Sequence, residues 1–148
     1  MKYIKLAIDE AKIAFEHGEV PVGAVLVRNG EIISSSHNKC EQQCDATSHA
    51  EMNVIKEAQH KLKRKILDDC ELYVTLEPCA MCAGAIVNAR IKRVYIGLLE
   101  PKTGCMGSVA DLHNILPHKV ETYYGFCEDE CKELMKEFFK SRRKNAEE

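Results

Sequence analysis

Residues 71–89 have the sequence ELYVTLEPCAMCAGAIVNA, and this stretch decides the fold. The apolar run at 71–76 is typical of a buried β-strand, and Pro78 ends it because proline cannot donate a hydrogen bond to a sheet. The small apolar side chains of 79–89 suit a helix that packs directly against that sheet. The stretch therefore predicts a strand followed at once by a buried helix, the unit of which α/β proteins are built.

The same alternation continues on both sides of this unit. Asn29-Gly30, between two β-prone runs, is the strongest short-range signal for a hairpin. The expected elements around 71–89 are a helix over 2–17 ended by Gly18, a hairpin of 20–27 and 31–36, a loop over 37–46, a helix over 49–64, strands over 93–99 and 119–125, and a closing helix over 127–143. This order predicts a mixed sheet with helices on both faces.

The composition is that of a globular protein. A chain of 148 residues has room for one sizeable core, so we expect a single domain over 1–148. With 45% hydrophobic and 30% charged residues the chain is not of the disordered class. No apolar run approaches the ~18–20 residues of a membrane span, and acids interrupt the N-terminal apolar stretch. We therefore expect a cytoplasmic protein with no secretion signal and no membrane partner.

The formal net charge is −2 and the pI is about 6.3, which by itself argues against a nucleic-acid partner. The basic residues are not evenly spread, however. They concentrate in KLKRK (61–65), ARIKR (89–93) and KSRRK (140–144). A near-neutral total can therefore hide a basic groove, within one subunit or across a dimer.

Eight cysteines need an explanation. Without a secretion signal, reduced thiols are a better expectation than a disulfide framework. Cys79 and Cys82 form a C-x-x-C pair at an expected helix start, where the positive end of the helix dipole favours thiolates and metal binding. Cys127 and Cys131 lie one turn apart on the apolar stripe of the closing helix, and we interpret them as core. No role is assigned to Cys40, Cys44, Cys70 or Cys105.

A second polar segment, His49-Ala50-Glu51, begins the helix before this strand. Helix N-termini gather at the carboxyl ends of the strands of an open α/β sheet, so the second helix can begin beside the first. His49, Cys79 and Cys82 would then make a zinc site with three protein ligands and one open position, the pattern of catalytic zinc. Glu51 could take a proton from an activated water and return it to a substrate, which supports hydrolytic deamination as a hypothesis.

Each residue alone has a simpler explanation. Glu51 fits a capping box with Ser48, His49 would more often be a satisfied polar residue, and C-x-x-C could be a redox pair. C-x-x-C could also be half of a structural zinc site, with Cys105 or Cys44 completing it. Together, however, His-x-Glu and Pro-Cys-x-x-Cys at this separation strongly indicate a metal site.

H-x-E followed by P-C-x-x-C is the signature of the zinc deaminases. Beyond that signature, the sequence resembles the bacterial tRNA-specific adenosine deaminases of the cytidine/deoxycytidylate deaminase superfamily. The resemblance spans nearly the whole chain and is carried by 20–25, Asn38, 45–51, 72–85, 102–104 and Phe138-Phe139. The sequence departs from the family pattern at Ala46, Ser48 and Glu100, where Pro, Ala and Asp are usual.

The resemblance implies a three-layer α/β/α fold of the cytidine-deaminase type, with a five-stranded mixed sheet between helices. It implies a homodimer with one Zn²⁺ per subunit on His49, Cys79 and Cys82, and with Glu51 as proton shuttle. The implied reaction is deamination of adenosine to inosine at the wobble position of a tRNA anticodon stem-loop. The implied substrate contacts are Asn38, Val20, Pro21, Leu76, Glu77 and Pro78 around the base, Glu100 and Lys102 near the flanking nucleotides, and Phe138, Phe139, Arg142 and Arg143 on the closing helix.

Two alternatives stay open from the residues alone. One is a zinc deaminase of a free base or nucleoside such as guanine, cytosine or cytidine, because such an enzyme would use the same chemistry. The other is a non-catalytic, zinc-stabilised binding module. The segment KEFFKSRRK (136–144) favours RNA, since aromatic and basic side chains suit stacked bases and phosphates, although a solvated helix end has the same composition. Which tRNA is used is left open.

Overall fold

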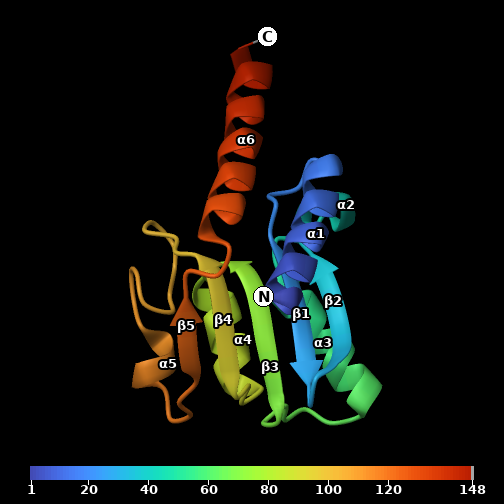
Figure 1. The fold of residues 1–148 in the computed structure, drawn as a ribbon, viewed down its shortest axis with the longest axis vertical. Coiled ribbons are helices and arrows are strands. Elements are labelled where there is room, and N and C mark those ends of the chain that lie inside the picture. Colours follow the sequence, from blue (N-terminus) through green and yellow to red (C-terminus); the bar gives the residue numbers. More distant parts are fainter. Residues whose placement is uncertain (148) are drawn as a thin grey trace.

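The computed structural model describes residues 1–147. A five-stranded sheet with the order β2-β1-β3-β4-β5 lies between two layers of helices (Figure 1). The strands are β1 (Gly23–Arg28), β2 (Glu31–His37), β3 (Cys70–Leu76), β4 (Arg93–Leu98) and β5 (Glu121–Tyr124). β1 pairs antiparallel with β2 and β3, whereas β3, β4 and β5 run parallel. The predicted mixed sheet is confirmed.

Three of the four long helices cover the faces of the sheet (Figure 1). α1 (Lys2–Glu16) covers one face, and α3 (Ala50–Leu62) and α4 (Ala80–Asn88) cover the other, whereas α6 (Glu128–Glu147) begins near the end of β4 and extends beyond the strands. α3 ends before the predicted residue 64 because Lys63 adopts a left-handed conformation with φ 53°. The short helices α2 (Cys40–Gln43) and α5 (Leu112–Ile115) lie in connections where no helix was predicted. No helix within residues 1–147 is both long and apolar enough to cross a membrane.

The larger of two hydrophobic cores lies between the sheet and α3 and α4. Leu72, Val74 and Ile96 from the sheet and Val54 and Ile86 from the helices are all fully buried there. Burial of each such side chain contributes roughly 1.5–3 kcal/mol relative to an exposed one. This packing holds both helices against the sheet and so fixes where each of them begins.

α1 packs so closely on β1 that one position there must be glycine. A Cβ atom at Gly23 would overlap the carbonyl oxygen of Ala7 in α1. The smaller core, formed by Ile4, Ala7, Val25 and Val27, lies at this contact. Gly23 also donates its backbone N–H to Thr75 Oγ1 at 3.1 Å, which ties β1 to the C-terminal end of β3.

Candidate active site and metal centre

Two helix starts lie side by side at the edge of the sheet where β3 ends. His49 immediately precedes α3 and Cys79 immediately precedes α4, and both residues have the extended backbone of an N-cap, with ψ of 152° and 179°. Cys82 lies in the first turn of α4. Because α3 and α4 pack on the same face of the sheet, their N-terminal ends bring these three predicted residues together.

The ligand atoms of His49, Cys79 and Cys82 lie within 4.8 Å of one another. His49 Nδ1 is 3.5 Å from the Sγ atom of each cysteine. Tetrahedral zinc, with Zn–S near 2.3 Å and Zn–N near 2.0–2.1 Å, would separate nitrogen from sulfur by about 3.6 Å. The three side chains therefore fit a zinc ion. Among the side chains that the structure describes, no other group of three or more metal-binding residues converges in this way.

The two thiols differ strongly in their acidity. Hydrogen bonds with Cys82 and with His49 lower the pKa of Cys79 to about 4. The hydrogen bond with Cys79, together with burial, raises the pKa of Cys82. The same contact with Cys79 raises the pKa of His49. Without a metal, Cys79 is therefore the thiolate and Cys82 the thiol. A bound cation would release the proton that Cys82 still carries.

Glu51 lies in the first turn of α3 and is only 4% exposed. Burial raises its pKa to about 7. A carboxyl group with this pKa, next to a metal-binding group, can both accept and donate a proton near neutral pH. The position and the acidity of Glu51 are therefore those of a general acid and base.

The predicted capping box of Ser48 and Glu51 is wrong. The N-cap of α3 is His49, and no side chain of the helix end caps it. The Ser48 hydroxyl instead bonds Gln43 Oε1 at 2.8 Å and Asn53 Oδ1 at 3.3 Å. The Ser48 hydroxyl therefore does not cap the first turn of α3.

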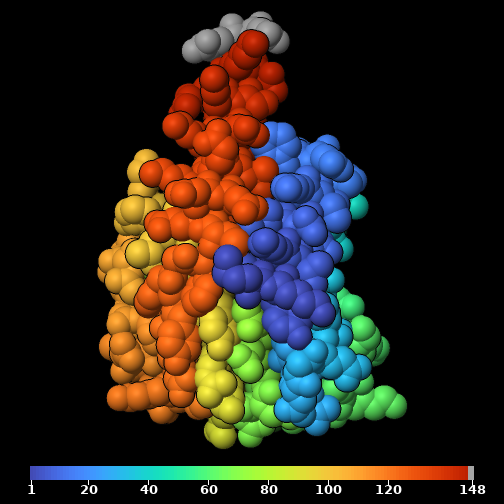
Figure 2. All heavy atoms as spheres, viewed as in Figure 1, coloured from blue at the N-terminus to red at the C-terminus, as the bar shows by residue number. Residues whose placement is uncertain are grey.

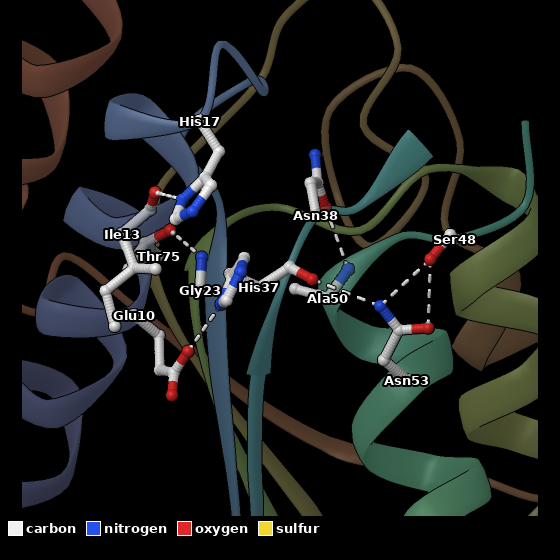
Figure 3. Close-up of polar contacts among 10 residues, drawn as sticks. All are labelled: Glu10, Ile13, His17, Gly23, His37, Asn38, Ser48, Ala50, Asn53 and Thr75. Carbon is white, nitrogen blue, oxygen red and sulfur yellow. Dashed lines mark hydrogen bonds and ion pairs between the residues drawn. The ribbon is translucent and has the colours of Figure 1, made fainter. Parts of the chain in front are cut away.

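Asn38 supplies the acceptor that α3 lacks. Its Oδ1 accepts the backbone N–H of Ala50 at 2.8 Å, and its amide nitrogen points away from Ala50 (Figure 3). Asn53 Nδ2 donates to the carbonyl oxygen of His37 at 3.1 Å and to Ser48 Oγ at 3.2 Å (Figure 3). These contacts fix the strand end that carries Asn38 against the start of the helix that carries His49.

A pocket of about 200 Å³ opens above this group. Besides His49, Glu51 and Cys79, the predicted residues that line it are Val20, Asn38, Leu76, Glu77 and Arg142. Pro21 and Pro78, which were predicted beside the base, are buried and do not line it. The lining residues without a predicted role are Glu19, Val22, Cys40, Glu41 and Thr103. Glu19 directly precedes Val20, which was predicted to line the pocket. Its place as an acidic residue before an apolar strand is the one sequence feature that could have indicated a pocket role for it.

A second pocket, of about 560 Å³, lies between α6 and the segment after β4. It is lined by Glu100, Lys102, Phe139, Arg142, Arg143 and Ala146, so five of the residues predicted near the RNA meet there. Arg142 borders both pockets, which makes them neighbours.

Phe138 does not line either pocket. It is 5% exposed, and its ring packs edge-on against Phe15 of α1 with centroids 5.9 Å apart. The Arg142 guanidinium lies over the other side of the ring, 4.9 Å from the centroid. Phe138 therefore anchors α6 on α1, whereas Phe139, 44% exposed, faces the second pocket.

The three basic clusters do not form one groove within the chain. Residues 61–65 span the C-terminal end of α3, and residues 89–93 lead into β4, so both clusters lie at the edge of the sheet opposite the pockets (Figure 1). Arg64 there is paired with Asp69, and Arg93 with Glu121. Of the three clusters, the one on α6 borders the second pocket, through Arg142 and Arg143.

The three-layer fold and the His-Cys-Cys group beside a buried glutamate define the class of metal-dependent nucleobase deaminases. The profile of the MafB19-like deaminases matches residues 1–143. The chain belongs to this deaminase family.

Within the deaminases, the chain is similar to curated proteins of one kind, the tRNA-specific adenosine deaminases. The chain is 50% identical to the tRNA-specific adenosine deaminase of Aquifex aeolicus, over 97% of this chain and 95% of the relative. It is 48% identical to that of Bacillus subtilis, over 96% of this chain and 89% of the relative. A solved chain from a study of A-to-I editing by tRNA:A34 deaminases at the wobble position of transfer RNA superposes with a TM-score of 0.87. That chain is 43% identical, and the match covers 90% of this chain and 98% of the solved one.

Proposed function

We propose that the chain converts adenosine to inosine at the wobble position of a tRNA anticodon, with water consumed and ammonia released. The observation that carries the proposal is the placement of buried Glu51 beside His49, Cys79 and Cys82. Glu51, His49 and Cys79 also line one pocket. The relatives that match this chain over nearly their full length are tRNA-specific adenosine deaminases, which supports the choice of substrate.

We infer that His49, Cys79 and Cys82 hold one zinc ion. Thiolate and imidazole ligands favour zinc over hard cations such as Mg²⁺, which prefer oxygen. When bound, zinc supplies a Lewis acid that makes water acidic enough to act as a nucleophile near neutral pH. Three protein ligands leave access for that water, which a structural site with four would not.

Glu51 moves the proton in this proposal. Its carboxylate takes one proton from water and delivers it to the purine ring nitrogen. It then takes the remaining proton of the added hydroxyl group and delivers it to the amino group, which leaves as ammonia. Burial, which raises its pKa to about 7, keeps both protonation states accessible during the cycle. The surrounding protein also excludes bulk water, because Glu51 is 4% exposed.

The first pocket suits a single base that has been turned out of the RNA. Asn38 lines it with the amide nitrogen unused by Ala50, so a purine acceptor atom can bind there. Val20, Leu76 and Glu77 form further parts of its wall. An unpaired loop nucleotide enters such a pocket at low cost, since no duplex has to be opened.

The second pocket favours RNA over a free base. Lys102 and Arg143 can meet phosphates, and Phe139 offers an exposed ring on which a neighbouring base can stack. A free base or nucleoside would fill only the first pocket and leave these groups without a partner. We therefore assign the flanking nucleotides of the anticodon loop to the second pocket.

We further propose that residues 1–148 act as one catalytic domain, with one zinc per subunit of a homodimer, in the cytoplasm. Matches that cover 95% and 89% of two relatives are consistent with a one-domain enzyme. A cytoplasmic location suits reduced cysteines and a tRNA substrate. Sedimentation of the purified protein would test the dimer.

The proposal is tested by incubating the purified protein with an anticodon stem-loop that carries adenosine at the wobble position, followed by sequencing for inosine. We expect inosine at that position and none in a matched stem-loop whose adenosine lies one nucleotide away. Free adenosine, cytidine and guanine should stay unchanged. Conversion of a free base or nucleoside, with the RNA untouched, would overturn the proposal.

A further inference from the structure

Glu77 directly follows β3 and is buried, with 3% exposure, although it is a charged residue. Its carboxylate is saturated with hydrogen-bond donors from one other segment. Oε1 accepts the backbone N–H of Glu100 at 3.0 Å and the hydroxyl of Ser108. Oε2 accepts the backbone N–H of Met106 at 3.1 Å and that of Ser108 at 2.9 Å. The carboxylate of Glu77 is thus used to bind residues 100–108.

This segment, residues 100–108, is called the rim loop below. Its tip carries Lys102, which lines the second pocket, and Thr103, which lines the first. The loop lacks a strand or long helix of its own. Besides the carboxylate, it is attached to the end of β3 by the N–H of Cys105, which donates to the carbonyl oxygen of Pro78 at 2.9 Å. Glu77 is therefore the main side-chain anchor of the loop.

Gly104 gives an independent sign that the loop is built around this carboxylate. A Cβ atom at Gly104 would overlap all three atoms of the Glu77 carboxyl group. The backbone of the loop therefore lies directly on the carboxylate. Only glycine permits that approach, because any side chain would collide with the carboxyl group. Close packing, and not an unusual φ, therefore explains the glycine in Lys102-Thr103-Gly104.

We propose that Glu77 is a positioning residue that holds the rim loop in the shape that presents Lys102 and Thr103 to the RNA. This inference rests on the proposed function for the identity of the substrate. A buried carboxylate suits the task because it only accepts hydrogen bonds and can satisfy several backbone N–H groups at once. Glutamine has nearly the same shape but places an NH₂ group against at least one backbone N–H, so the loop loses an anchor.

The test compares Glu77→Gln and Gly104→Ala with the wild-type protein. Asp69→Asn is the matched control, because Asp69 lies just before β3, at its opposite end, and accepts hydrogen bonds from Arg28 and Arg64. Amide hydrogen exchange is measured without RNA, and zinc content and steady-state kinetics on the anticodon stem-loop follow. We expect faster exchange at Met106 and Ser108 in both rim-loop variants, with exchange in α3 unchanged.

In the kinetic arm we expect KM to rise about tenfold in both rim-loop variants, with kcat within about twofold and one zinc per chain retained. The control should change neither the exchange of the rim loop nor KM. Unchanged exchange in Glu77→Gln, unchanged KM with a loosened loop, or loss of zinc would each overturn the inference. Wild-type turnover on the stem-loop tests the proposed function separately, and the exchange measurement does not depend on it.

Discussion

Two carboxylates show how single residues acquire different chemistry within this chain. Burial raises the pKa of Glu51 to about 7. Burial acts in the same direction on Asp69, but hydrogen bonds from Arg28 and Arg64 outweigh it and lower its pKa to about 2. At neutral pH Asp69 is a fixed charge, whereas Glu51 exchanges a proton readily. Environment, not residue type, therefore distinguishes Glu51, the proposed proton carrier, from Asp69.

The prediction at the residue scale concerns Glu51→Gln. Glutamine keeps the shape of the side chain but cannot carry the proton, so kcat on the stem-loop should fall by about 10²–10⁴-fold. The zinc content, measured by mass spectrometry of the purified protein, should stay at the wild-type level because Glu51 is not a ligand. Loss of zinc would make Glu51 a structural residue, and unchanged turnover would contradict its catalytic role.

At the scale of elements, α6 has two different faces. Phe138 packs on Phe15 and under Arg142, and so attaches the helix to α1. Phe139 is exposed at the second pocket. Figure 2 shows α6 beside α1, with its C-terminal part extending beyond the rest of the molecule. The helix thus uses one side for attachment and offers the other to a partner.

Two alanine substitutions separate these faces. Phe138→Ala removes a buried ring and should reduce the free energy of unfolding by roughly 3 kcal/mol. Phe139→Ala should leave the melting temperature nearly unchanged but raise KM for the stem-loop several-fold, since stacking on an aromatic ring contributes about 1–3 kcal/mol per base. Thermal unfolding and kinetics of both variants check this. The reverse pattern would show that Phe138, and not Phe139, meets the RNA.

The long elements could be predicted from the sequence because each carries several repeats of an apolar pattern. α2 and α5 could not, since four residues are too few to show a helical period. The start of α3 near His49 could be predicted, but its cap could not. Its backbone acceptor comes from Asn38, twelve residues before Ala50, so a tertiary contact replaces the local capping box.

At the scale of the whole molecule, the sequence identifies the His-Cys-Cys group and Glu51 because these residues stand in short motifs at helix starts. It does not identify Glu19, Cys40 or Thr103 as pocket residues. Glu19 and Thr103 lie in loops and Cys40 begins the four-residue helix α2, and such segments have no periodic pattern. The sequence also suggests a groove from three basic clusters, two of which lie at the far edge of the sheet. Charge summed along a chain does not reveal position in space.

Two of the eight cysteines join His49 in the candidate metal-binding group. Cys70, Cys105 and Cys131 are buried elsewhere, Cys44 is exposed, and Cys40 and Cys127 are half-buried. Neither Cys44 nor Cys105, the candidates for a fourth ligand, joins the group of His49, Cys79 and Cys82. A catalytic site with three protein ligands is therefore the arrangement that the fold favours over a structural site with four.

X-ray absorption at the zinc edge of the purified protein tests this ligand number most directly. We predict one zinc per chain with two sulfur ligands and one imidazole, from Cys82, Cys79 and His49. A third sulfur ligand or a second imidazole would complete a protein shell around the metal. That result would contradict the catalytic site and favour a zinc-stabilised binding module.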